Sequence, residues 1–286
     1  MQAPCSPLQA ESQKLQRAAG ALRLQVGLRD GRSVLRSLYQ QAPCRALMPD
    51  RAPEGPFEAV LVNSSGGLVG GDKLAFEIDI APNTAASLVS QAAEKVYRSS
   101  GADTLVETRL SAGAGAWLEW LPQETILFDG ARLRRKLVAT LDPAARLLAA
   151  ELVLFGRAAH GESFSRGFLH DSWAIRSGSR LAWTDAIRLE GDIAAERARP
   201  FGFGRAAGYA TLLHAGPQAA SFLPVAREIA EAAPADGGAT LVNGLLLLRF
   251  LAEDGARLRQ SVVQAAGRLR NAIAGLPETL PRVWQV

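Results

Sequence analysis

Three carboxylates, Glu119, Glu124 and Asp129, lie close together in the stretch 117–129, among two tryptophans and several leucines. Two carboxyl groups that flank a sugar can hydrolyse a glycosidic bond, one as the acid and the other as base or nucleophile. The other interpretation is that these carboxylates are exposed or hydrogen-bonded, because the sequence does not show the gap between them. A β-rich, carbohydrate-active hydrolase that uses Glu119 and Glu124 therefore stays open as an alternative function.

A second group resembles a set of metal ligands and consists of Glu151, Glu162, His160 and His170. Carboxylate and imidazole together suit borderline dications such as Ni²⁺. The competing interpretation is structural, because Arg157 lies nearby and can pair with a glutamate at a turn of a sheet. We favour the structural interpretation.

A glycine-rich run precedes Asp72 and contains Gly66, Gly67, Gly70 and Gly71. Such a backbone can adopt positive φ and can be approached closely by other groups. The run lacks the lysine and hydroxyl residue that end a phosphate-binding loop, and a strand-like pattern follows it instead of a helix. We therefore predict a tight structural turn and no nucleotide site.

Short segments with strand-like patterns recur at roughly ten-residue spacing, which is typical of all-β architecture. They lie at 22–28, 57–62, 74–80, 85–91, 104–110, 115–121, 133–141, 146–154, 171–176 and 180–190. Helical periodicity occurs late, at 218–232 and 258–273. The segment 240–250 is ambiguous, and we favour a buried strand because a helix would contain Gly244. A sandwich, a barrel and an irregular β-solenoid all fit this pattern.

The composition indicates a folded protein, since 48% hydrophobic residues in a chain of 286 can form a sizeable core. No apolar run reaches the length of about eighteen residues needed for a spanning helix, and the N-terminus lacks a signal pattern. We therefore predict a cytoplasmic protein with no membrane partner. The two cysteines, Cys5 and Cys44, lack zinc-ligand spacing.

Charge is distributed unevenly, because residues 54–129 hold 11 acidic and 4 basic residues although the chain has a net charge of +4. A nucleic-acid binder usually combines clustered basic residues with aromatic ones, and the nearest candidate is only the run 132–136. We predict no nucleic-acid partner. The run is interpreted as the solvated face of a strand, with a contact patch for an acidic partner as the alternative.

Four motifs follow one another along the chain, at 66–74, 94–99, 118–131 and 156–167. In their order and spacing they resemble the UreD family of urease accessory proteins, called UreH in some species. The resemblance continues more loosely through 244–249 and the terminal helix, and spans most of residues 22–270. The sequence departs from the family pattern at Asn63, Ser64 and Ser65, where many members carry a sequence similar to His-Pro-Pro before the first glycine.

The resemblance implies a mainly β fold, an irregular β-helix-like stack of many short strands with about two helices toward the C-terminus. It implies a single β-rich domain with a C-terminal helical region over 19–286. Residues 1–18 contain Pro4 and Pro7 and show no apolar period, so we predict a flexible N-terminal tail there. The resemblance also implies a function as a urease maturation chaperone, not an enzyme. Such a protein binds urease apoprotein together with UreF, which brings the GTPase UreG, and helps to deliver nickel. Nickel would be bound transiently, and no cofactor permanently.

Two sets of site residues follow from this resemblance as hypotheses. An acidic passage favours a dication, so the nickel path would include Asp72, Glu119, Glu124, Glu151 and Glu162. The helical region 256–273 would contribute to UreF docking through Arg257, Arg259, Leu269 and Arg270.

Overall fold

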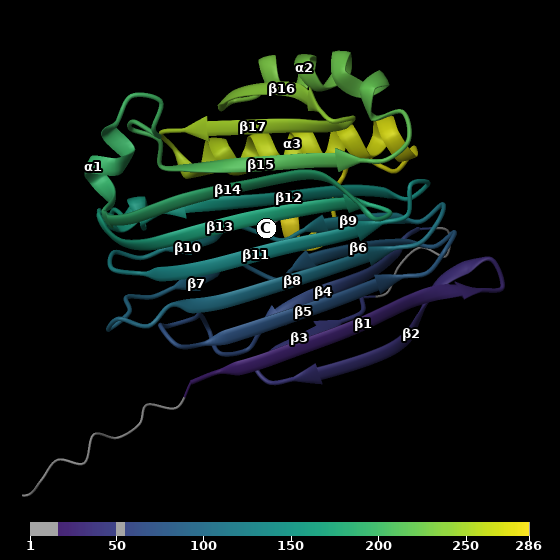
Figure 1. The fold of residues 1–286 in the computed structure, drawn as a ribbon, viewed down its shortest axis with the longest axis horizontal. Coiled ribbons are helices and arrows are strands. Elements are labelled where there is room, and N and C mark those ends of the chain that lie inside the picture. The colour runs from purple at the N-terminus through teal and green to yellow at the C-terminus, as the bar shows by residue number, and fades with distance from the viewer. Residues whose placement is uncertain (1–16, 50–54, 286) are drawn as a thin grey trace, which may run out of the picture.

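The structure is a computed structural model that describes residues 17–49 and 55–285. The tail predicted over 1–18 lies outside the described residues except for Arg17 and Ala18. The described chain is mainly β and is built from two large sheets with helices toward its C-terminus (Figure 1). The predicted fold class is confirmed: the molecule is a β-solenoid of about four turns.

Sheet 1 has seven strands in the order β14-β13-β11-β8-β5-β1-β2. They are β1 (Ala19–Arg29), β2 (Arg32–Gln41), β5 (Lys73–Ile80), β8 (Thr104–Ala112), β11 (Arg132–Leu141), β13 (Arg166–Ser177) and β14 (Arg180–Asp192). The strands β1, β5, β8, β11 and β13 run parallel to one another. The hairpins β1–β2 and β13–β14 form the two antiparallel edges of the sheet.

Sheet 2 has ten strands, and its main path is β16-β17-β15-β12-β9-β6-β4-β3. They are β3 (Cys44–Leu47), β4 (Phe57–Asn63), β6 (Ala85–Ser90), β9 (Trp117–Leu121), β12 (Arg146–Phe155), β15 (Gly208–Ala215), β16 (Asp236–Val242) and β17 (Leu245–Ala252). Two short strands, β7 (Glu94–Val96) and β10 (Thr125–Leu127), pair with each other, and β10 also pairs with β12. The parallel set β4, β6, β9 and β12 lies opposite the parallel set of sheet 1, and each turn of the solenoid supplies one strand to each of these two sets.

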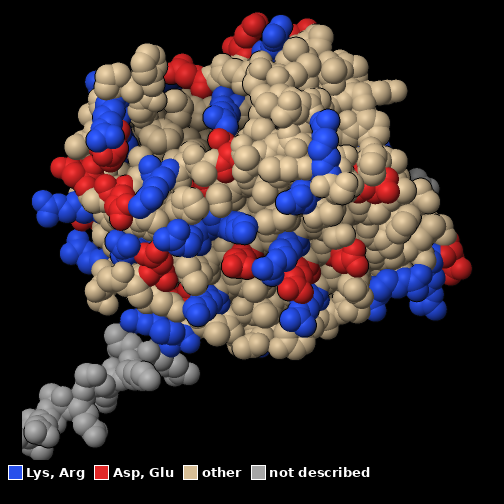
Figure 2. Space-filling model, viewed as in Figure 1, with Lys and Arg blue, Asp and Glu red and all other residues tan. Residues whose placement is uncertain are grey.

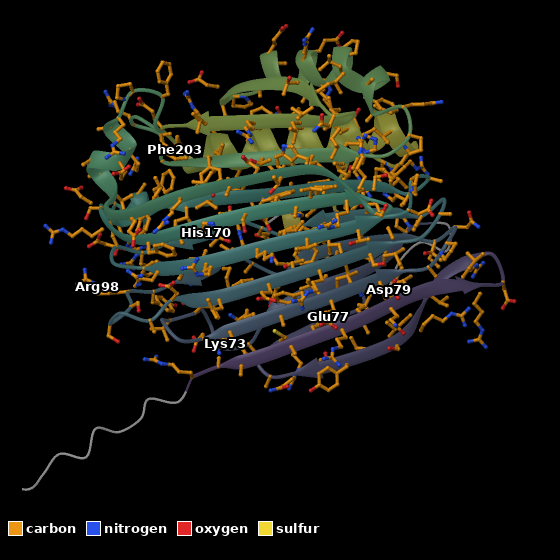
Figure 3. The ribbon with its side chains drawn as sticks, viewed as in Figure 1. Lys73, Glu77, Asp79, Arg98, His170 and Phe203 are labelled. Atoms are coloured by element: carbon orange, nitrogen blue, oxygen red, sulfur yellow. The ribbon has the colours of Figure 1, made fainter. Side chains whose placement is uncertain are left out.

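Strand alternation places apolar side chains between the sheets and charged ones outside. In β5, Leu74, Ile78 and Ile80 are buried, whereas Lys73 and Asp79 are exposed. These two charged residues and Glu77 project from the outer face of sheet 1 (Figure 3). Basic and acidic side chains are interspersed over that face (Figure 2). The strand predicted for 74–80 is therefore present, and its outer face is charged.

Helices cover the outer face of sheet 2. α2 (Leu223–Glu231) and α3 (Gly255–Ala274) pack on it, whereas α1 (Ile193–Ala198) follows β14. Single-turn helices occur at η1 (Ala158–His160), η2 (Ala219–Phe222) and η3 (Arg282–Trp284). The Asp254 side chain accepts the backbone N–H groups of Ala256 and Arg257 to start α3, and Gly275 ends it with a φ of 67°. Both helical segments predicted from periodicity are thus present.

Strand β9 separates two cores. Leu118 and Trp120 point between the sheets, whereas Trp117 and Leu121 point toward the helices. Glu119 shares the second face, because it alternates with those two residues. A third core closes one end of the solenoid around Phe155 and the ends of β7 and β10.

The sequence patterns missed some strands, either because the strand is buried on both faces or because it is short. Every residue of β15 is buried, because sheet and helices cover both of its faces, so no alternation marks it. The strands β3, β7 and β10 are too short to show a period. The ambiguous segment 240–250 belongs to the hairpin β16–β17, in which Gly244 has a φ of 83° at the turn, so the choice of a strand was right.

Candidate functional site

A cavity of about 290 Å³ lies between the two sheets. It extends from Gly66, Gly67 and Glu94, near the surface, to the buried side chains of Arg135 and Glu151. Most of the remaining lining is apolar, from strands of both sheets and from the loops after β4 and β6. The cavity is thus lined by few charged side chains. Their surroundings have low polarity, so the electrostatic interactions between them are strong.

The glycine-rich run forms one rim of this cavity. Positive φ values of 76°, 139° and 97° occur at Gly66, Gly67 and Gly71. A Cβ on Gly67 would lie 2.5 Å from the Tyr97 ring, and one on Gly70 would collide with Ser99. Asp72 follows the turn and is buried, and its carboxylate accepts the N–H groups of Ala18 and Val69 at 2.8 Å each. Asp72 thus holds the turn and does not line the cavity.

Glu94 provides a carboxylate at the same rim. Asn63 donates its side-chain amide to both Glu94 oxygens, at 3.0 and 3.1 Å. Burial nevertheless raises the pKa of Glu94 to about 7. Burial, with the Glu94 charge nearby, also raises the pKa of the Cys44 thiol, to about 11. Near neutral pH, Glu94 is therefore present in both its protonated and its ionised form, whereas the Cys44 side chain stays protonated.

Glu151 shares one guanidinium with a second carboxylate inside the solenoid. Arg135 Nη2 lies 3.1 Å from Glu151 Oε2 and 2.6 Å from Asp171 Oδ2. Asp171 also accepts Arg135 Nε at 2.9 Å and the Tyr209 hydroxyl at 2.7 Å, so Asp171 is the better satisfied carboxylate. Burial raises the pKa of Glu151, and Arg135 opposes that rise. When both carboxylates are ionised, this buried cluster carries one negative charge in excess.

Glu119 and Glu124 lie on the helix side of sheet 2, away from the cavity lining. Glu119 is fully buried and receives two hydrogen bonds from Arg270, at 2.7 and 3.1 Å. Glu124 accepts Arg259 Nη1 at 2.6 Å. Each glutamate is thus neutralised by an arginine of α3. Neither glutamate is therefore free to act as an acid or a nucleophile. The alternative function, a hydrolase that uses Glu119 and Glu124, is wrong.

The group around Glu162 is a surface turn. Arg157 pairs with Glu162, and Glu162 also accepts the backbone N–H of Asp129 at 3.2 Å. The pair between Arg157 and a glutamate at a turn, which the structural interpretation expected, is thus present for Glu162, whereas Glu151 lies apart at the cavity. Among residues 17–49 and 55–285, no three histidine, cysteine or acidic side chains stand together as a metal-binding group.

The residues expected to dock UreF divide between the two faces of α3. Arg257 is exposed and Arg259 is partly exposed, but Leu269 is fully buried and Arg270 nearly so. Leu269 packs in the core beneath the helix, and Arg270 holds Glu119 and the carbonyl groups of Pro277 and Thr279. The last two residues therefore do not offer side chains to a partner in this structure.

Two residues of the cavity were not among the predicted sites. Arg135 was assigned to a solvated strand face, and the structure places Arg134 and Lys136 there but buries Arg135. The signal was present, because Arg135 alternates in phase with Leu133 and Leu137, which both point inward. Glu94 lies at the start of a segment that supported the family resemblance.

The described residues thus define a β-solenoid that encloses a cavity with a few charged groups inside. The sequence profile of the UreD urease accessory protein family matches residues 18–285. Proteins named urease accessory protein UreD are similar over nearly their whole length. That of Magnetococcus marinus is 45% identical and covers 96% of this chain and 97% of its own. Those of Methylobacterium sp. and Rhizobium johnstonii are 43% and 40% identical, over 94% and 95% of this chain and 95% and 96% of their own.

The chain therefore belongs to the UreD urease accessory protein family. It is a non-catalytic accessory protein of urease maturation. No helix among the described residues is long and apolar enough to cross a membrane.

Proposed function

We propose that this protein is a cytoplasmic scaffold that binds urease apoprotein together with UreF, and through UreF the GTPase UreG, while nickel is delivered to urease. Membership of the urease accessory family supports this proposal. The exposed side of α3, with Arg257 and the accessible part of Arg259, is the surface that we assign to UreF.

The observation that carries the nickel proposal is the cavity that Glu94 and Glu151 both line. We assign the nickel path to this cavity, and of the five carboxylates predicted for it we retain only Glu151 and add Glu94. Carboxylate oxygens accept Ni²⁺, and the excess negative charge beside Arg135 favours a dication over an anion.

Proton exchange fits a transient role for these groups. A carboxyl group with a pKa near 7 is partly protonated at neutral pH, so an arriving dication displaces a proton and a returning proton helps to release it. The two carboxylates enter the cavity from different strands, Glu94 from β7 and Glu151 from β12. Nickel is thus cargo here and not a resident cofactor.

The test is urease activation at limiting nickel with Glu94→Gln and Glu151→Gln. Both changes keep the shape of the side chain and remove its charge. We expect several-fold less active urease, restored by excess nickel, with complexes that still assemble in pull-down assays. Glu162→Gln is the matched control, because Glu162 is a surface carboxylate outside the cavity. Full activation by both cavity variants at limiting nickel would contradict the proposed path.

A further inference from the structure

The cavity between the sheets has one carboxylate at its rim and another at its inner end, Glu94 and Glu151. Glu94 on β7 pairs in register with Thr125 on β10, and Thr125 pairs with Val153 on β12. Glu151 lies two residues before Val153 on the same strand. A strand spacing of about 4.8 Å and a rise of about 3.3 Å per residue place the two glutamate Cα atoms about 12 Å apart. The two carboxylates are therefore separate negative positions in one cavity.

Each of these positions carries one negative charge when its carboxyl group is ionised. At the rim, Glu94 accepts hydrogen bonds from neutral donors. Lys95, the other charged residue there, is exposed, because alternation turns its side chain to the other face of β7. At the inner end, the single charge of Arg135 is shared between Glu151 and Asp171. The cavity as a whole therefore suits a ligand with two positive charges.

Glu151 also has an unsatisfied oxygen atom. The residue is only 4% exposed, and its Oε2 has no hydrogen-bond partner among the described residues. Arg135 Nη2 lies 3.1 Å from this atom without the geometry of a hydrogen bond, because its bond goes to Asp171 at 2.6 Å. A buried acceptor without a donor is costly. An N–H group of a ligand at the inner end would supply the missing donor.

Most of the remaining lining is apolar. It includes the aromatic rings of Phe76 and Trp120, whose centroids lie 6.2 Å apart. Methylene groups gain free energy when they leave water for such a surface, and aromatic rings attract ammonium groups. The cavity volume of about 290 Å³ is at the lower end of the range for small-molecule sites. A short alkyl chain therefore fits the lining between the two carboxylates.

We propose that this cavity binds a linear alkyl diammonium ion, with one ammonium group at Glu94 and the other at Glu151. Each ammonium group donates hydrogen bonds to one carboxylate, and the methylene chain covers the apolar lining. A monoamine leaves one carboxylate without a counter-charge, and a neutral diol leaves both without one. The inference goes beyond the proposed function, because it needs the cavity and its charges but no metal ion. A diammonium ion in this cavity would exclude nickel from it.

The experiment is titration calorimetry of the full chain in an amine-free buffer at about pH 8, where Glu94 is largely ionised. The ligands are α,ω-diaminopentane, pentylamine and pentanediol. We expect one diaminopentane to bind per chain, about thirtyfold more tightly than pentylamine, because the monoamine loses one buried charge pair. Pentanediol should not bind. From diaminopropane to diaminooctane the affinity should pass through a maximum, because the strands fix the spacing of the two carboxylates.

Two variants test the assignment of the two ends. Glu94→Gln and Glu151→Gln should each weaken diaminopentane binding about thirtyfold, and thermal unfolding shows whether each variant is folded. Glu162→Gln is the matched control, because Glu162 is a surface carboxylate outside the cavity, and it should bind diaminopentane like the parent.

The ligand series on the parent chain decides the proposal even if a variant does not fold. Diaminopentane binding less than about threefold tighter than pentylamine binding would overturn it, as would unchanged affinity in both folded variants. The nickel path is judged separately. Diamine binding that leaves urease activation at limiting nickel unaffected would contradict the nickel path and support the diammonium site. Nickel-dependent defects of the two variants without any diamine binding would support the nickel path and overturn the diammonium site.

Discussion

Carboxylates are buried in two regions of the molecule, between the sheets and beneath α3. Beneath α3, Glu119 has a partner of its own in Arg270, which also binds two backbone carbonyl groups, so the charges are balanced. Between the sheets, Arg135 serves both Glu151 and Asp171, and Glu94 accepts hydrogen bonds from neutral donors, the side-chain amide of Asn63 and the backbone N–H of Lys95. Burial alone does not decide the outcome, because Glu119 and Glu151 are both buried but only Glu119 has an arginine of its own. The balance of charge, more than burial, separates a structural carboxylate from one that can accept a cation.

The largest expected effect follows from breaking the balanced pair. Arg270→Met should lower the free energy of unfolding by about 3–5 kcal/mol, because it leaves the fully buried Glu119 without a counter-charge. Urea denaturation at pH 7 measures this loss. The double variant Glu119→Met with Arg270→Met is the control and should recover most of it, since an apolar pair of similar volume replaces the ion pair. A loss below about 1 kcal/mol in the single variant would contradict the comparison.

A smaller effect of opposite sign is expected at the cavity. The pKa of Glu94 is raised from 4.5 to about 7 in the folded chain. The folded state therefore loses stability relative to the unfolded chain as the pH rises from 4.5 to about 7, and this loss stays constant at higher pH. Glu94→Gln removes this penalty. The variant should match the parent below about pH 4.5, gain relative stability as the pH rises, and level off above about pH 7 at about 3 kcal/mol. Thermal unfolding of both chains from pH 4 to 8 measures the difference, and a constant difference across that range would refute the assignment.

The smallest effect is expected at the surface turn. Arg157 and Glu162 form an ion pair whose side chains are 41% and 24% exposed. Arg157→Ala should change the free energy of unfolding by less than about 1 kcal/mol, because water screens the pair and the side chains lose entropy in forming it. Measurements at low and high salt should agree closely. A loss of unfolding free energy comparable to that of Arg270→Met would contradict the expectation that exposed ion pairs stabilise the fold less than buried ones.

Local patterns predicted the secondary structure of the molecule well. Alternation in β5 and β11 follows from one face packing on the core and one face meeting water, and this rule needs no knowledge of the partner strand. The stripe of buried residues on α3 follows from the helical period in the same way. Residues 19–286 as a single domain stays a prediction, as does the docking of UreF on α3.

By itself, then, the sequence determined most of the longer strands, the two late helices, the glycine turn and the family. Only the tertiary structure decided which carboxylates have partners. Glu119 and Arg270 are 151 positions apart and meet because α3 packs on sheet 2. Arg135 and Asp171 meet because β11 and β13 pair in register. Partners of this kind are set by packing over long separations in the chain, and local periodicity carries no information about them.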